Sequence, residues 1–132
     1  MKRKEFIVKC SLCMIGVVAG CAGTKYVSVP IEGDSLVVPL LSFTDRKYVV
    51  VENEKLEYPI CVYRFSDNEY KALLMRCTHQ GTELQVFGDR LQCPAHGSEF
   101  SNTGTVQNGP ADTALRTFEV SVLTDTIKIK LS

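Results

Sequence analysis

Four residues of the chain have side chains suited to binding a transition metal: Cys77, His79, Cys93 and His96. They form a C-x-H pair and a C-x-x-H pair, with 13 residues between His79 and Cys93. Two thiolates and two imidazoles can hold one structural Zn²⁺. They can also hold a two-iron cluster, with both cysteines on one iron and both histidines on the other. The spacing alone allows either metal.

The two pairs are predicted to face each other across a β-hairpin. Residues 83–87 and 90–93 are typical of strands, and only Gly88-Asp89 separates them, which suits a two-residue turn with glycine first. This hairpin folds the second pair back towards the first. The four side chains are therefore expected at one end of a hairpin.

The rest of the chain after residue 25 is predicted to be all-β. Segments rich in Val, Leu, Ile and Tyr alternate with polar turns, and no window shows a 3.6-residue apolar repeat. The segments are 34–43, 48–51, 60–65, 70–76, 83–87, 90–93, 115–123 and 126–131. In the last one, Ile127 and Ile129 alternate with Lys128 and Lys130, which indicates one buried and one exposed face. We expect about eight to ten short antiparallel strands, arranged as a sandwich or a small barrel.

Composition excludes several classes of function. A chain of 132 residues has room for one domain, and its 15 Lys and Arg balance 15 Asp and Glu. Without a surplus of basic residues, nucleic acid is not an expected partner. No glycine-rich nucleotide loop is present, and both histidines are assigned to a metal, so no independent catalytic site is predicted.

The sequence resembles the Rieske iron–sulfur family from Cys77 to about Leu115. Beyond the four metal-binding candidates, the shared residues are Gly97-Ser98, Phe100, Gly104, Gly109-Pro110 and Leu115. The resemblance implies one [2Fe–2S] cluster in a rubredoxin-like subdomain of two loops, spanning about 77–115, on an antiparallel β-sandwich or small barrel. It also implies that Cys77 and Cys93 hold an inner iron, whereas His79 and His96 hold an outer one.

Three positions depart from the respiratory members of that family, which carry a disulfide between the two loops. Thr82 and Ala95 stand where those two cysteines would be, so no disulfide is expected near the cluster. Phe100 stands where those proteins have a tyrosine that hydrogen-bonds a ligand sulfur. Ser98 remains and can donate to a bridging sulfide. Since hydrogen bonds to cluster sulfurs stabilise the reduced state, we expect a reduction potential below the respiratory type.

Of the six cysteines, only Cys61 remains unassigned in the part of the chain after residue 21. It lies in an apolar segment, and a buried, free side chain is the expected state. The acidic residues Glu52, Glu54 and Glu57 indicate a solvated loop, and Arg116 is expected to be a solvated strand residue.

Residues 1–20 are predicted to be a cleaved signal peptide. Basic residues at positions 2–4 precede an apolar run of about 14 residues, which is short for a membrane span. The run ends in Val-Ala-Gly-Cys21, which resembles the lipobox of bacterial lipoproteins, so Cys21 is the expected lipidation site. The alternatives are a soluble secreted protein and an uncleaved anchor. Removal of four basic residues and one acidic residue leaves 11 against 14 charges, a net charge of −3, for residues 21–132.

Together these features predict a single-electron carrier, exported and attached to a membrane by lipid, facing the periplasm or the cell exterior. Its expected partner is another redox protein: a quinol-oxidising cytochrome complex, a cytochrome or a periplasmic oxidoreductase. A Rieske ferredoxin that supplies an oxygenase is the alternative, since such ferredoxins also lack the disulfide. A binding module that keeps the cluster only for folding is a third possibility.

Overall fold

The computed structural model describes residues 23–132, so the predicted signal peptide and Cys21 lie outside the described residues. Within this range the regular elements are thirteen strands and one short 3₁₀ helix, η2. The elements are β1 (Tyr26–Ser28), β2 (Ile31–Glu32), β3 (Ser35–Pro39), η2 (Leu40–Phe43), β4 (Tyr48–Glu52), β5 (Ile60–Ser66), β6 (Glu69–Leu74), β7 (Gln85–Phe87), β8 (Arg90–Gln92), β9 (Glu99–Ser101), β10 (Val106–Asn108), β11 (Thr117–Phe118), β12 (Val120–Val122) and β13 (Thr126–Lys130). The all-β prediction is confirmed, with more and shorter strands than expected. No helix in the described range is long and apolar enough to cross a membrane.

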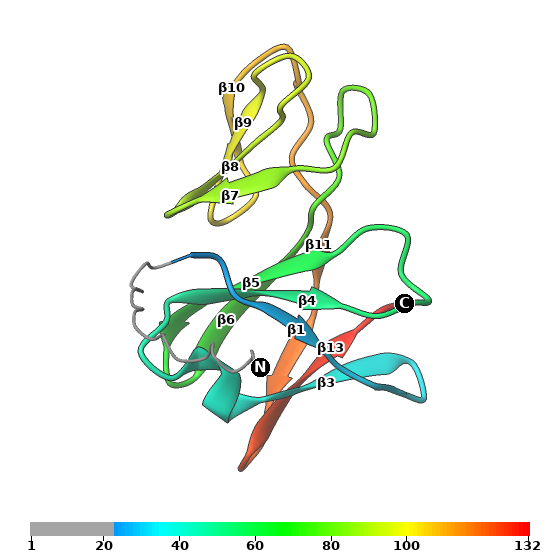
Figure 1. Ribbon diagram of the computed structural model, residues 1–132, viewed down its shortest axis with the longest axis vertical. Coiled ribbons are helices and arrows are strands. Elements are labelled where there is room, and N and C mark those ends of the chain that lie inside the picture. Colours follow the sequence, from blue (N-terminus) through cyan, green and yellow to red (C-terminus); the bar gives the residue numbers. More distant parts are fainter. Residues whose placement is uncertain (1–22) are drawn as a thin grey trace, which may run out of the picture.

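The strands form three sheets that make up two parts of the molecule (Figure 1). The orders are β1-β4-β5-β6-β11, β12-β13-β3-β2 and β10-β9-β8-β7. The first two sheets pack together as the base. The third sheet, with the loops 77–82, 93–98 and 109–115, forms the small subdomain at one end of the long axis. Pairing is antiparallel except between β1 and β4, which are parallel.

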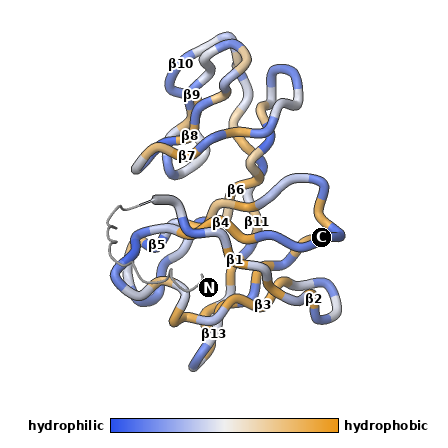
Figure 2. The backbone as a smooth tube through the Cα atoms, in the orientation of Figure 1, coloured by the Kyte–Doolittle hydropathy of each residue, from blue (hydrophilic) through white to orange (hydrophobic). Residues whose placement is uncertain are grey.

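The five-stranded sheet is buried on both faces, and this explains its continuous apolar runs. Side chains of a strand alternate between its two faces. On β4, Val49 and Val51 belong to the core shared with the other base sheet, whereas Val50 belongs to the core below the small subdomain. On β5, Val62 likewise belongs to the core shared with the other base sheet, and Cys61 belongs to the core below the small subdomain. Figure 2 shows these apolar strands between the polar loops at the ends of the molecule.

One predicted strand is wrong in its second half. Residues 34–43 were expected to be a single strand, but β3 ends at Pro39 and η2 follows. Proline has no N–H to continue a ladder. The amide and the hydroxyl of Thr44 then both donate to the carbonyl of Leu41, at 3.1 and 2.8 Å, and close the turn that buries Phe43.

A second predicted strand, 115–123, is two strands in different sheets. β11 pairs with β6 in the five-stranded sheet, whereas β12 pairs with β13 in the other base sheet. The chain therefore changes sheets at Glu119, whose carbonyl accepts a hydrogen bond from the amide of Lys130 at 2.9 Å. The apolar pattern of residues 115–123 indicates that they are buried, but it does not indicate that the chain passes from one sheet to the other.

The predicted hairpin is confirmed. β7 pairs with β8, with Phe87 opposite Arg90, and Gly88 has φ +62° at the first turn position. That left-handed conformation favours glycine. The alternation in β13 is also confirmed, because Ile127 and Ile129 are fully buried.

Candidate metal centre

Two loops of the small subdomain share one backbone geometry. In the loop 77–82, the amide of Cys77 donates to the carbonyl of Thr82 at 2.8 Å, and the amide of Gly81 donates to the carbonyl of Cys77 at 2.8 Å. In the loop 93–98, the amide of Cys93 donates to the carbonyl of Ser98 at 2.8 Å, and the amide of Gly97 donates to the carbonyl of Cys93 at 3.0 Å. Each loop thus closes on itself and presents its cysteine in the same way.

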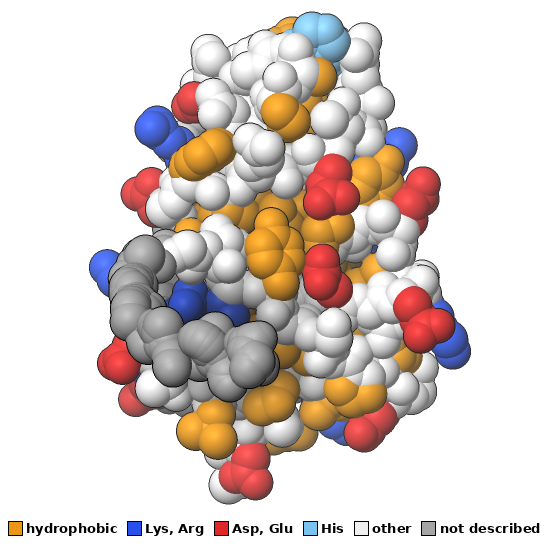
Figure 3. Space-filling model, viewed as in Figure 1, with side chains coloured by type: hydrophobic (Ala, Val, Ile, Leu, Met, Phe, Trp, Pro, Cys, Tyr) orange, Lys and Arg blue, Asp and Glu red, His pale blue; other side chains and the backbone are white. Residues whose placement is uncertain are grey.

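The two loops bury their cysteines and expose their histidines. Cys77 and Cys93 are each 2% exposed, and they belong to one core. His79 and His96 are exposed, with ring centroids 5.4 Å apart and planes at 82°. Histidine side chains lie at the end of the long axis in Figure 3. The sequence-predicted residues are therefore brought together as an inner thiol pair and an outer imidazole pair.

The surroundings of Cys93 favour its thiolate form. Burial acts to raise the pKa of the Cys93 thiol, but hydrogen bonds from the backbone amides of Ala95 and His96, with contacts to Cys77 and Thr82, outweigh it and hold the pKa below its usual value. The thiolate is the form that ligates metals. These donors are the kind that stabilise charge on a ligating sulfur.

A third loop, 109–115, covers the candidate site and is tied to both of the loops 77–82 and 93–98. The fully buried hydroxyl of Ser98 accepts a hydrogen bond from the amide of Ala111 at 3.0 Å. The hydroxyl of Thr78 donates to the carbonyl of Thr113 at 2.6 Å. The Gly109-Pro110 peptide within this loop is cis. Sequence reasoning identified Ser98 but missed Thr78, because a threonine hydroxyl aimed at a carbonyl 35 positions away leaves no local pattern.

Gly81 and Gly97 are needed for their backbone conformation. They have φ +78° and +82°, the left-handed region that glycine adopts without strain. A Cβ on Gly97 would meet no protein atom within 4 Å. Within the protein itself, the requirement for glycine at this position is therefore conformational.

Two tyrosines of the base fasten the small subdomain, and neither was identified from the sequence. The hydroxyl of Tyr58 donates to the carbonyl of Gly81 at 2.6 Å, and that of Tyr63 donates to the carbonyl of Gly88 at 2.8 Å. Burial raises the pKa of the Tyr63 phenol, so it remains a donor. The first contact holds the loop 77–82, and the second holds the hairpin between the two loops.

Replacement of Tyr63 by phenylalanine should lower the free energy of unfolding by about 1 kcal/mol, because the partly buried hydrogen bond from Tyr63 to the carbonyl of Gly88 is lost. Urea unfolding followed by circular dichroism measures this. Tyr26→Phe is the matched control, since the side chain of Tyr26 is 56% exposed. Equal stability of the two variants would contradict the assigned contact.

Other predicted side chains occupy the expected surroundings. Cys61 is free and fully buried, and burial raises the pKa of its thiol, so it packs as a small apolar residue. Arg116 is exposed, lies 4.6 Å from the ring centroid of Phe118 and donates to the carbonyl of Leu131 at 3.0 Å. Phe100 is fully buried in the core that contains Cys77.

Within residues 23–132, no three His, Cys, Asp or Glu side chains converge on a position for a single metal ion. The donor set is two thiols and two imidazoles on paired loops, and it fits a cluster with two chemically different irons. The fold and the site together define a small all-β protein whose candidate metal centre lies at one end of its long axis.

Comparison with known proteins identifies the family. The model of the Rieske [2Fe-2S] domain matches residues 25–119, so the chain belongs to the Rieske family, whose members carry a [2Fe–2S] cluster. The chain is 31% identical over 106 residues to the cytochrome b6-f complex iron-sulfur subunit of Parasynechococcus marenigrum. The matched region covers 79% of this chain and 53% of that subunit. It is 32% identical over 85 residues to the cytochrome b6-f complex iron-sulfur subunit of Desmonostoc, and this match covers 63% of this chain and 41% of that subunit. The chain thus spans about half the length of these relatives.

Solved structures agree with the fold. The plasma membrane Rieske protein of Synechocystis superposes with a TM-score of 0.60 and 26% identity, over 70% of this chain and 95% of that one. A chain from the complex of reduced oxygenase and oxidised ferredoxin in carbazole 1,9a-dioxygenase superposes with a TM-score of 0.58 and 25% identity, over 76% and 95%. An electron-transfer role follows from the family, but the comparisons divide between two kinds of partner.

Proposed function

We propose that this protein carries single electrons between redox proteins, with its [2Fe–2S] cluster held by Cys77, Cys93, His79 and His96. The observation that supports this most directly is the pair of matched loops, which bury both thiols and expose both imidazoles. When bound, the cluster supplies one-electron chemistry at a potential of roughly −150 to +300 mV. The buried thiolates hold the inner iron away from water, and the exposed imidazole edges provide a short route to a partner.

The assignment is tested on the purified protein. Visible absorption, and a rhombic electron paramagnetic resonance signal after reduction that integrates to one spin per chain, are the expected results. A colourless protein containing zinc would contradict the assignment, because zinc gives neither signal.

We infer that the protein is exported and held at a membrane by lipid on Cys21, which lies outside the described residues. The basic start, the short apolar run and the Gly-Cys21 junction support this. Mass spectrometry of the mature N-terminus and accumulation of precursor in the presence of globomycin are the tests. A mature chain without lipid on Cys21 would contradict the anchor.

A Rieske ferredoxin that supplies an oxygenase is the second candidate. Thr82 and Ala95 in place of the disulfide cysteines favour it, as does the structural similarity to a chain of a ferredoxin–oxygenase complex. Cell fractionation separates the two functions, since an oxygenase supplied from nicotinamide cofactors requires a cytoplasmic protein.

Phe100→Tyr should raise the midpoint potential, because the new hydroxyl lies in the core that contains both cysteines and can donate to a ligand sulfur. Protein film voltammetry measures the shift. Phe100→Leu is the control, since it changes packing without adding a donor and should not raise the potential. A Phe100→Tyr protein with an intact cluster and an unchanged midpoint would rule out the missing hydroxyl as the cause of a low potential.

A further inference from the structure

The start of the described chain is fixed to one side of the base. The carbonyl of Gly23 accepts a hydrogen bond from Arg46 at 2.9 Å, and the hydroxyls of Thr24 and Tyr48 lie 3.4 Å apart. The carbonyl of Lys25 then accepts from the amide of Val50 at 2.9 Å, and β1 begins. Only Ala22 separates Gly23 from Cys21, and this link spans at most about 7 Å. A lipid on Cys21 would therefore keep this side of the base beside the bilayer.

The surface around Gly23 is continuous, and we call it the anchor-side face. Three adjoining hollows make it up, and each pair of hollows has residues in common: Lys47 and Tyr48 for one pair, Thr44 and Asp45 for another, and Arg64 for the third. It consists of the segment 44–48, the end of β5, the turn after β5 and the tip of the β7–β8 hairpin.

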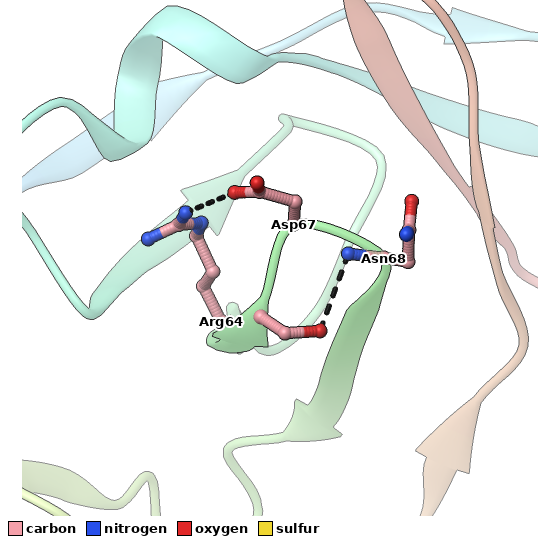
Figure 4. A network of polar contacts seen from close by, with 4 residues as sticks. Arg64, Asp67 and Asn68 are labelled. Atoms are coloured by element: carbon pink, nitrogen blue, oxygen red, sulfur yellow. Dashed lines mark hydrogen bonds and ion pairs between the residues drawn. The ribbon is translucent and has the colours of Figure 1, made fainter.

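The anchor-side face combines aromatic side chains with balanced charges. Phe65 is 41% exposed and lines the same hollow as Tyr48. Tyrosine is enriched at membrane interfaces, and phenylalanine is among the side chains that interfacial segments bury at the boundary between headgroups and acyl chains. The charged residues of the three hollows are Arg46, Lys47, Arg64, Asp45, Asp67 and Asp89, three of each sign. Arg64 pairs with Asp67, and the amide of Asn68 donates to Ser66 in the same turn (Figure 4). The face therefore suits a bilayer surface without depending on anionic lipid.

This face lies on the side of the molecule and not at the end opposite the metal centre. In Figure 1 the described chain starts at mid-height of the long axis, and the small subdomain occupies one end. With the anchor-side face on the bilayer, the long axis runs along the membrane. The exposed edges of His79 and His96 then point sideways, towards a partner in the same membrane.

We propose that the anchor-side face rests on the lipid surface and fixes the protein in one orientation, with its metal centre directed along the membrane plane. The proposal rests on the inferred lipid anchor at Cys21. The occupant is the bilayer itself, because so short a link leaves no room for a protein between this face and the headgroups.

Tryptophan reporters test the orientation, because the chain contains no Trp. Phe65→Trp places a reporter on the anchor-side face. Lys55→Trp is the matched control, since Lys55 is exposed beyond the far end of β4, and that strand alone spans about 17 Å. Each full-length lipoprotein is reconstituted into vesicles of phosphatidylethanolamine and phosphatidylglycerol with either brominated or ordinary acyl chains. The absorption spectrum of the cluster confirms that each variant is folded.

The expected result is loss of most Phe65→Trp emission on brominated vesicles, with unchanged Lys55→Trp emission, because only the first reporter lies near the acyl chains. The quenching should be the same without phosphatidylglycerol. Equal quenching of the two reporters, or none at Phe65→Trp, would overturn the fixed orientation while the protein still floats with the vesicles. Mass spectrometry of Cys21 separates the causes: an unlipidated Cys21 overturns the anchor and the orientation together, and leaves the electron-carrier function untouched.

Discussion

Replacement of Cys93 by alanine should yield a protein with no [2Fe–2S] cluster. Cys93 is 2% exposed, and the amides of Ala95 and His96 stabilise its ionised form, so the substitution removes the proposed inner ligand at a position that water cannot reach. Iron content and the visible spectrum of the purified variant measure the effect. The expected content is close to zero against two irons per chain in the unchanged protein.

Cys61→Ala is the matched control for this experiment. Cys61 is also buried, and it lies in the same core as Cys93, but it comes from β5 and not from either of the loops 77–82 and 93–98. Both variants lose one buried sulfur, and only one should lose iron. Full iron content in Cys93→Ala would disprove its role as a ligand, whereas loss of iron from both variants would show that core packing controls cluster retention.

The four metal-binding candidates could be predicted from the sequence because their chemistry is carried by residue type and short spacing. C-x-H and C-x-x-H each fit within one tight loop, and Gly81 and Gly97 mark the turns. The hairpin was predictable for the same reason, since Gly88-Asp89 is a local signal.

The contacts that support the site could not be predicted in this way. Tyr58 and Tyr63 reach carbonyls 23 and 25 positions away, and nothing in their own segments distinguishes them from other tyrosines. The prediction of a single strand over 115–123 was wrong for a related reason. Apolar pattern reports that a residue is buried, but pairing partners depend on how the whole chain folds.

The largest change in potential is expected from replacing both histidines with cysteine. His79→Cys/His96→Cys gives the outer iron two thiolates in place of two neutral imidazoles and adds negative charge to the cluster. Its midpoint should fall to near −400 mV, the range of all-cysteine [2Fe–2S] ferredoxins. Because both side chains are exposed, the substitution removes no buried packing. Protein film voltammetry measures the midpoint, and the electron paramagnetic resonance spectrum shows whether the ligands have changed.

The single variant His96→Cys tests the same argument with a smaller change, since it turns the loop 93–98 into a C-x-x-C loop and leaves the loop 77–82 intact. Its midpoint should lie between those of the unchanged protein and the double variant. Cys77 and His79 are separated by one residue, whereas Cys93 and His96 are separated by two. A cysteine side chain is shorter than a histidine side chain, so His79→Cys leaves the tighter pair with less reach. We therefore expect His79→Cys to retain less iron than His96→Cys. A double variant that assembles its cluster but keeps a midpoint above −150 mV would show that the histidines do not set the potential. If the midpoint falls as expected, the imidazole pair sets the potential. The proposed route to a partner uses the same exposed edges, so each of these variants is expected to alter the proposed contact as well as the potential.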